Sequence, residues 1–319
     1  MLKSPIAGWM LTIAVLLFGN GVASGQSYPT KPIRIIAAEV GGGADVVARI
    51  VANSMSVPLG QPVIVENRPA SLNGEMVAKA TPDGYTLLLA SSTFIFAPLF
   101  RKEPYDPVKD FSPITMLAKA PNIIVVHPSV PVNSVKELIA LAKAKPGVLN
   151  YASGGAGSSI HLAGELFKNM AGVDIVRVAY RGSGPALNAL LGGQVQVMFA
   201  TAASAAPHLK SGKLKALAVT GHQPSALVPG LPTVTASGVP GYEFEALYAI
   251  SAPAKVPAAV IKRLNNDLVR VLNQADFKEK FLNSGVEAAP SSPTELATVI
   301  KSEIVKIGKL IKDANIRAD

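Results

Sequence analysis

Three consecutive glycines, Gly41 to Gly43, stand between an apolar run and a segment with helical spacing. The run "IRIIAA" at 33–38 reads as a strand, and Asp45 falls in the first turn of the helix that follows. Backbone N–H groups at a helix N-terminus point outward and carry about half a positive charge, which favours an anion. The turn therefore predicts a small carboxylate or phosphate site, although glycines here also fit a tight turn without a ligand.

The common nucleotide-binding motifs do not fit this turn. A phosphate loop has Lys and then Ser or Thr after its glycines, where this chain has Ala44 and Asp45. The dinucleotide fingerprint needs a further glycine at the position of Val46. The residues therefore argue against both classes of nucleotide site.

A second glycine turn, "SGGAGSSIHLAGE" at 153–165, brings together Ser158, Ser159, His161 and Glu165. Neither serine has the Gly-x-Ser-x-Gly frame of a nucleophile elbow. His161 and Glu165 share a helix face and would make half of a metal site, but no second half is evident. Serines at the start of a helix are typical of caps that also offer hydroxyls to a ligand. Ligand binding or capping is the main prediction, and a Ser/His hydrolase is the alternative.

Two further turns are rich in hydrogen-bond donors. "ASST" at 90–93 ends a predicted strand with three hydroxyls, and "AYRGSGPA" at 179–186 places Arg181 beside Tyr180. An arginine can bind a carboxylate through two hydrogen bonds, although a solvent-facing arginine is equally common. All four turns follow strands, and ligands of parallel α/β sheets bind at the carboxyl ends of strands. We therefore expect the four turns to share one site.

Strands and helices alternate from Pro32 onward, with a buried strand at 122–128 and a helix that begins with a capping box of Ser134 and Glu137. Two predicted helices present apolar faces, formed by Val46, Val47, Ile50 and Val51 and by Leu162, Leu166 and Met170. The last 65 residues read mostly as two amphipathic helices around "EAAPSSP". This order predicts an α/β protein with two similar lobes, each a mainly parallel sheet flanked by helices, and a ligand cleft between them.

Composition narrows the functional classes. The chain has 319 residues, 30 basic and 21 acidic side chains, four His and no Cys, with a pI of 9.6. The basic residues are scattered and few aromatics lie near them, which argues against nucleic-acid binding. No disulfide is possible, and the four His have no metal-ligand spacing, so we expect no metal.

The N-terminus reads as a secretory signal. Lys3 precedes an apolar stretch at 9–18, and small residues lead to a cleavage point within 23–25. A signal peptide at 1–25 predicts export to the periplasm.

Ordered motifs connect these turns to a known family. The segments "GGGADVVAR", "PDGYTLL", "SSIHLAGELF" and "YRGSGPALNALLGGQV" occur in this order within a similarity that runs from about Tyr28 to the C-terminus. They resemble the extracytoplasmic solute receptors of tripartite tricarboxylate transporters, often called Bug receptors. The resemblance implies a two-lobed periplasmic binding protein, similar to type II, that closes on a small organic carboxylate. It implies a monomer without catalysis or a required cofactor, which hands its ligand to a membrane permease or, in some members, acts in signalling as a sensor.

The resemblance also assigns lobes and contacts. Lobe 1 would comprise 28–122 and 247–319, lobe 2 would comprise 123–246, and hinges would lie near 122–127 and 243–249. Ligand contacts of lobe 1 would come from Val40, Gly41, Gly42, Ala44, Asp45, Ser91, Ser92 and Thr93. Those of lobe 2 would come from Ser153, Gly157, Ser158, Ser159, Tyr180, Arg181, Gly182 and Ala200. In the family, main-chain N–H groups and bridging waters hold one carboxylate between the lobes.

Three departures from the family pattern bear on the ligand. Ala38, Glu39 and Val40 replace an aromatic residue and a proline, which should widen the pocket. "ASLNG" follows 67–69 where the family has a glycine-rich loop, and Ala200 stands where many members have an acid that can bind an ammonium group. We therefore predict a ligand without an amino group: an aliphatic dicarboxylate, a hydroxy acid or an aromatic carboxylate.

Overall fold

The computed structural model describes residues 28–38 and 43–316, so the predicted signal peptide at 1–25 lies outside the described residues. The strands are β1 (Ile33–Ala37), β2 (Val63–Asn67), β3 (Thr86–Ser91), β4 (Phe111–Val126), β5 (Asn150–Ser153), β6 (Val176–Ala179), β7 (Val197–Thr201), β8 (Lys215–Val219), β9 (Glu245–Pro253) and β10 (Glu287–Ala288). The helices are α2 (Gly43–Leu59), α3 (Ala70–Ala78), α4 (Ser92–Phe96), the 3-10 helix η2 (Ala97–Leu99), α5 (Val135–Ala144), α6 (Ser159–Ala171), α7 (Ser183–Leu191), α8 (Ala202–Lys210), α9 (Ala258–Leu272), α10 (Ala275–Asn283) and α11 (Pro293–Asp313). Within this part of the chain, no helix combines the length and the apolar character that crossing a bilayer requires.

The strands form a mixed sheet flanked by helices, in the order β2-β1-β3-β9-β4-β7-β5-β6, with β8 and β10 each paired to β4. β1 pairs parallel with β2 and β3, and β5 pairs parallel with β6 and β7. β9 runs antiparallel to both β3 and β4. The predicted parallel α/β units are therefore present, and the antiparallel exceptions include the two long strands, β4 and β9.

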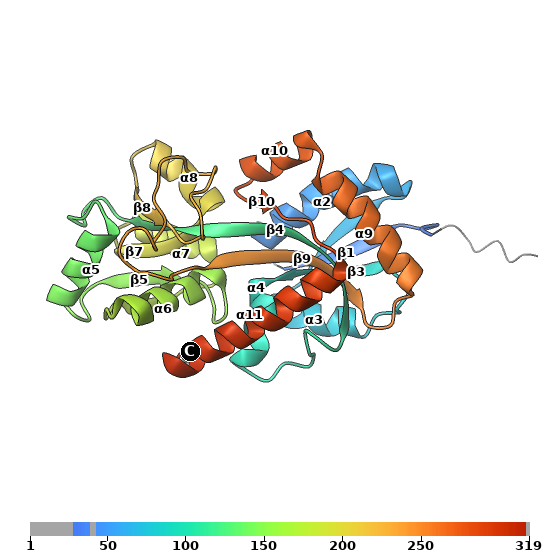
Figure 1. Cartoon of the computed structure of the whole chain (residues 1–319), viewed down its shortest axis with the longest axis horizontal. Helices are drawn as coiled ribbons and strands as arrows, with labels where there is room; N and C mark the ends of the chain where they lie inside the picture. Colours follow the sequence, from blue (N-terminus) through green and yellow to red (C-terminus); the bar gives the residue numbers. More distant parts are fainter. Residues whose placement is uncertain (1–27, 39–42, 317–319) are drawn as a thin grey trace, which may run out of the picture.

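β4 joins two portions of the sheet. Its residues 111–121 pair with β9, and its residues 122–126 pair with β7 and β8. We call the first portion, with β2, β1, β3, β9 and β10, portion A, and the second, with β7, β8, β5 and β6, portion B. Figure 1 shows the two groups of elements side by side, connected by the long strands β4 and β9.

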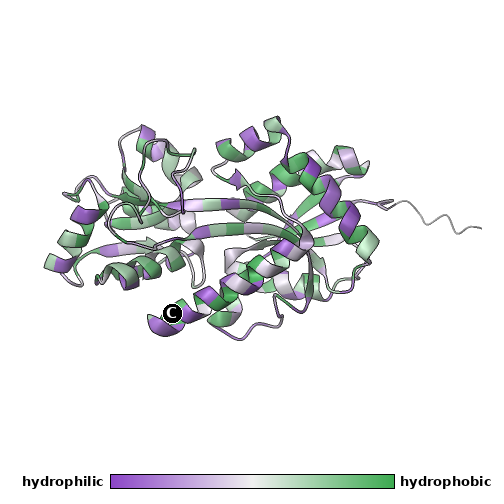
Figure 2. Cartoon of the chain, viewed as in Figure 1, coloured by the Kyte–Doolittle hydropathy of each residue, from purple (hydrophilic) through white to green (hydrophobic). Residues whose placement is uncertain are grey.

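The hydrophobic core has two parts because the sheet of portion A is covered on both faces. One cluster packs α2, α9 and α10 against one face of portion A. The other packs α4 and α11 against the opposite face and continues through portion B. Figure 2 shows that the covering helices are amphipathic, with apolar and polar residues on different sides.

The predicted apolar faces of two helices were correct in part. Val47 and Val51 in α2 and Leu162 in α6 are buried as predicted, whereas Val46 and Met170 are each 38% exposed. The buried faces also include Met55 in α2 and Ile160, Ala163 and Phe167 in α6. Where apolar residues are adjacent, the sequence does not say which of them faces the sheet.

The prediction of two C-terminal helices was wrong, because α9, α10 and α11 are separate. The chain turns at Asn273 and Gln274, where neither Gly nor Pro marks the break. The short strand β10 then adds to β4 before α11 begins. The predicted cap of α5 is confirmed, since Ser134 Oγ accepts a hydrogen bond of 3.2 Å from the Glu137 N–H. The capping box is incomplete, because the Glu137 side chain accepts a bond of 2.7 Å from the Asn133 N–H and not from the Ser134 N–H.

Candidate functional site

Helices begin soon after strands in both portions of the sheet. α4, α6, α7 and α8 follow β3, β5, β6 and β7 within a few residues, and α2 follows β1. The first N–H groups of each helix have no partner inside the helix, so each start offers hydrogen-bond donors. Val40, Gly41 and Gly42 lie outside the described residues, and Gly43 and Ala44 open α2.

A tyrosine that the sequence analysis did not single out lies beside the start of α2. Tyr248 of β9 pairs with Ser91 of β3, so the two side chains lie on the same face of the sheet. The Tyr248 hydroxyl lies so close to Gly43 that a Cβ atom at this position would overlap it. The only sequence signal for this contact was a tyrosine within the apolar strand "YEFEALYAISAP".

Two predicted contact residues of portion A use their side chains within the protein. Asp45 Oδ1 accepts a hydrogen bond of 2.9 Å from Asn67 Nδ2 and lies 2.9 Å from Arg49 Nε. Ser92 is 3% exposed, and its Oγ accepts a hydrogen bond of 2.9 Å from the Leu247 N–H of β9. These groups hold the turns in place, so a ligand would meet mainly their backbone. Thr93 follows in the first turn of α4 and is half-buried.

An arginine fixes the glycine turn that follows β5. Ser153 is fully buried, and its Oγ accepts a hydrogen bond of 2.7 Å from Arg177 Nε. Arg177 Nη2 donates a second bond of 3.1 Å to the Gly154 carbonyl. A Cβ atom on Gly154 would lie 4.0 Å from Gly182 Cα, so the turns at 153–158 and 180–184 adjoin. The structure thus brings two of the predicted turns together.

His161 closes the same turn from within α6. Its Nδ1 accepts a hydrogen bond of 3.2 Å from the Gly157 N–H, where φ is 79°. Ser158 is the N-cap of α6, and its Oγ accepts a bond of 3.3 Å from the His161 backbone N–H. Burial, with Arg177 and Lys168 adding to it, lowers the pKa of His161 to about 3, so the imidazole is neutral. Because Nδ1 is an acceptor, the proton of the neutral ring sits on Nε2.

The two portions touch at this turn. The rings of Phe100, which follows η2, and His161 have centroids 5.6 Å apart. A Cβ atom on Gly157 would lie 3.5 Å from the Phe100 ring, in ordinary van der Waals contact. Phe100 therefore forms one wall between the helix starts of portion A and those of portion B.

The geometry gives little support to a Ser/His hydrolase. Within the described residues, Ser158 bonds to the His161 backbone and no hydrogen bond joins a serine side chain to the His161 ring. Glu165 Oε1 accepts bonds of 2.6 Å from Tyr151 and 3.0 Å from Lys168, so the predicted half of a metal site does not form with His161. No group of three or more His, Asp or Glu side chains suited to a metal ion occurs in the same residues.

The remaining predicted contacts differ in exposure. Tyr180 is half-buried and Arg181 is exposed, and Gly182 is the N-cap of α7 with a φ of 121°. Ser159 is half-buried in the first turn of α6. Ala200 is fully buried opposite Ile123, so its side chain has no surface for a ligand in this structure.

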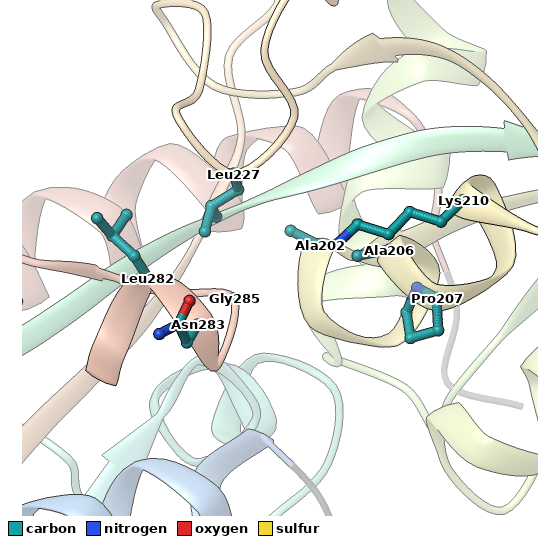
Figure 3. A pocket seen from close by; sticks show the side chains of 8 residues that line it. All are labelled: Ala202, Ala206, Pro207, Lys210, Leu227, Leu282, Asn283 and Gly285. Carbon is teal, nitrogen blue, oxygen red and sulfur yellow. The ribbon is translucent and has the colours of Figure 1, made fainter. Parts of the chain in front are cut away.

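A cavity of about 310 Å³ lies between α8 of portion B and α10 of portion A (Figure 3). Its lining residues are Ala202, Ala206, Pro207, Lys210, Leu227, Leu282, Asn283 and Gly285. None of the predicted site residues lines it, but Ala202 follows Ala200 by two positions at the start of α8. The two portions therefore enclose a cleft on the side of α8 and α10.

Comparisons with known proteins agree with the resemblance seen in the sequence. A family model described as "Tripartite tricarboxylate transporter family receptor" (TctC) matches residues 47–316. Protein BugT of Bordetella pertussis is 32% identical, with 95% of this chain and 96% of that protein covered. A UPF0065 protein of Bordetella bronchiseptica is 35% identical, with 97% of this chain and 93% of that protein covered.

Solved structures of periplasmic binding proteins match the fold. R. palustris Rpa4515 with adipate has a TM-score of 0.86 at 32% identity, covering 91% of this chain and 99% of that chain. MatC from Rhodopseudomonas palustris with bound malate has a TM-score of 0.80 at 30% identity, covering 89% of this chain and 100% of that chain.

Proposed function

Because the chain belongs to the tripartite tricarboxylate transporter receptor family, we propose that it captures a small organic carboxylate in the periplasm and delivers it to a membrane transporter. Lobe 1 comprises 28–122 and 247–319, and lobe 2 comprises 123–246. β4 and β9 bend near 122–127 and 243–249 to open and close the cleft. A ligand favours closure because it contacts both lobes at once.

The observation that carries this proposal is the contact between the two portions at a helix start, where the Phe100 ring lies against His161 and Gly157 of α6 and its turn. α2 supplies a further helix N-terminus in portion A, and α7 and α8 supply others in portion B. The N-cap of α7 is a glycine without a side chain, and Thr201 makes no capping hydrogen bond to α8. Each helix start carries about half a positive charge and free N–H donors, which suits a carboxylate.

The proposed ligand contacts follow from these helix starts. On lobe 1 they are the backbone of 40–45 and the turn at 91–93. On lobe 2 they are the turns at 157–159 and 180–182, with Thr201 beside them in place of the buried Ala200. The phenyl ring of Phe100 and the ring of His161 close one side.

We further propose that the ligand lacks an amino group. Ala200 occupies the position of the acid that could bind an ammonium group, and the Asp45 carboxylate is already engaged by Arg49 and Asn67. The two similar structures contain adipate and malate, both dicarboxylates without an amino group. An aliphatic dicarboxylate or hydroxy acid therefore fits best.

Thermal-shift measurements and calorimetric titrations with adipate, malate, succinate and aspartate test both statements. A bound ligand raises Tm by stabilising the folded state, so at least one acid should do so without being altered. Tighter binding of aspartate than of succinate contradicts the ligand class. Turnover of esters without stabilisation by any organic acid contradicts the receptor and supports a hydrolase.

Serine variants test the contact at the start of α6. Ser158→Ala combined with Ser159→Ala should weaken binding at least about tenfold, equivalent to about 1.4 kcal/mol. Ser134→Ala is the matched control, because it also removes the N-cap of a helix but lies at the start of α5. It should lower stability by about 1 kcal/mol and leave affinity unchanged. Unchanged affinity in the double variant would remove this turn from the site.

Delivery to a transporter needs a separate experiment. Uptake of the labelled acid by cells that lack this chain should fall and should return when the chain is restored. Unchanged uptake, with binding by the purified protein intact, would contradict delivery and favour a receptor that reports to a sensor.

A further inference from the structure

Tyr248 differs from the other deeply buried tyrosines of the chain. Tyr105, Tyr151 and Tyr242 each donate a hydrogen bond of 2.6 to 3.0 Å within the protein, to Phe94 O, Glu165 Oε1 and Ala163 O. The Tyr248 side chain is 7% exposed, and its neighbours on the same face of β9, Ala246 and Ile250, are also buried. Throughout 28–38 and 43–316 the structure gives its hydroxyl no hydrogen-bond partner. The hydroxyl is not among the fully enclosed side-chain atoms that lack a partner, Asn73 Oδ1 and Asn122 Oδ1, so it remains accessible and can donate to a ligand.

The unpaired hydroxyl faces the start of α2. It lies against Gly43, the first residue of this 17-residue helix, and the ring carbon Cζ would lie 3.3 Å from a Cβ atom there. Ser91 lies beside Tyr248 on the same face of the sheet, and its side chain makes no capping hydrogen bond to α4. Tyr248, Ser91 and the start of α2 thus lie near one another. Hydrogen-bond donors at the start of a helix favour an anion there.

The protonation state of Tyr248 fits this role. Burial raises the pKa of its phenol to about 12, so the hydroxyl keeps its proton at neutral pH and remains a donor. A fixed ring on a strand also sets the direction of the O–H group more strictly than a mobile side chain would.

We infer that Tyr248 is a ligand-binding residue of lobe 1, whose hydroxyl donates a hydrogen bond to the carboxylate held at the start of α2. The inference rests on the proposed function and adds a residue that determines specificity. Gly43 takes part in the same contact, because a Cβ atom there would overlap the Tyr248 hydroxyl and displace it. The Tyr248 and Gly43 pair therefore sets how closely a carboxylate approaches the α2 N–H groups.

Calorimetric titration of Tyr248→Phe with malate and adipate is the direct test. Removing a hydrogen bond to a charged group should weaken binding about tenfold to a hundredfold. The Tm of the free variant should stay the same or rise, since the hydroxyl has no partner within the described residues. Tyr242→Phe is the matched control: it removes a buried phenol hydroxyl that is bonded to Ala163, so it should lower Tm and leave affinity unchanged.

The outcomes separate this inference from the proposed function. If the wild-type protein binds a carboxylate and Tyr248→Phe binds it equally well, the inference is overturned and the receptor function stands. If the wild-type protein binds none of the acids, the proposed function fails first. Gly43→Ala is a second variant, which should weaken binding by displacing the ring; wild-type affinity would count against the inference.

A measurement on the wild-type protein complements the affinities of the variants. With tyrosine labelled by carbon-13 at the ζ position, the seven tyrosines give seven resonances, and the one that Tyr248→Phe lacks belongs to Tyr248. Saturation of the wild-type protein with the acid should shift this resonance. An unchanged Tyr248 resonance would overturn the inference, whether or not the resonance of Tyr180 shifts.

Discussion

Lowering the pH from 7 to 5 is expected to destabilise this protein through one buried side chain, His161. The ring is 1% exposed, and its Nδ1 accepts the Gly157 N–H, a bond that a protonated ring cannot make. Burial is the main cause that lowers its pKa to about 3, and the nearby cations Arg177 and Lys168 add to it. The folded protein therefore accommodates only the neutral form of the His161 imidazole.

The sign and size of the effect follow from linkage. The pKa of His161 in the folded protein lies below its unfolded value of about 6.5. Below pH 6.5 the unfolded chain therefore binds a proton at His161 that the folded chain does not bind. The stabilisation is complete above pH 6.5 and is lost as the pH falls towards 3. At pH 5 the difference of about 1.5 pH units corresponds to about 2 kcal/mol of unfolding free energy.

Urea unfolding of the wild-type protein and of His161→Asn at pH 7 and pH 5 measures this contribution. The Asn amide oxygen can accept the Gly157 N–H but does not titrate, so the variant should lose about 2 kcal/mol less on acidification. Glu245, whose pKa is raised by burial, acts with the opposite sign, but it is present in both proteins and cancels in the difference. His222→Asn, at an exposed histidine, is the control and should behave like the wild type. An equal pH dependence in wild type and His161→Asn would refute the reasoning.

Three further variants probe the contacts around the cleft. Phe100→Ala removes the ring of portion A that lies against His161 of portion B. Ligand affinity should fall about two- to tenfold. In X-ray scattering, the radius of gyration of the ligand-bound variant should exceed that of the ligand-bound wild type. A wild-type radius and affinity would count against a closing role. Gly164→Ala places a Cβ atom 2.5 Å from the Tyr151 ring, so chemical denaturation should show a loss of about 1–3 kcal/mol, and full stability would be at odds with the tight packing. Arg177→Met removes the hydrogen bonds that order the turn after β5. Amide hydrogen exchange at 153–158 should become faster and ligand binding several-fold weaker. Unchanged exchange would mean that the turn is ordered without Arg177.

Features that depend on a few neighbouring residues could be predicted from the sequence. The glycine turns after β5 and β6 and the caps at Ser134 and Ser158 are present in the structure. A cap forms between residues three positions apart, and a turn is closed within a few residues, so their signals are local. The family resemblance added the arrangement into two lobes.

Features that depend on which element packs against a residue could not be predicted in the same way. The apolar residues of α2 gave the correct period, but the sheet below decided that Val47 rather than Val46 is buried. The break between α9 and α10 carries no Gly or Pro, and the packing of α10 on portion A produces it. Ala200, chosen as a contact by resemblance, lies fully inside the core.

By itself the sequence determined the chemistry of the site: uncharged donors and helix starts after strands, suited to an anion. Only the tertiary structure decided which donors are free. The return of β9 between β3 and β4 places Tyr248 beside Ser91 and Gly43, while Ser92 is used by the Leu247 N–H and Asp45 by Arg49. Strand pairing joins residues that are far apart in the chain, and burial depends on every element packed around a side chain, so neither can be read from a short segment.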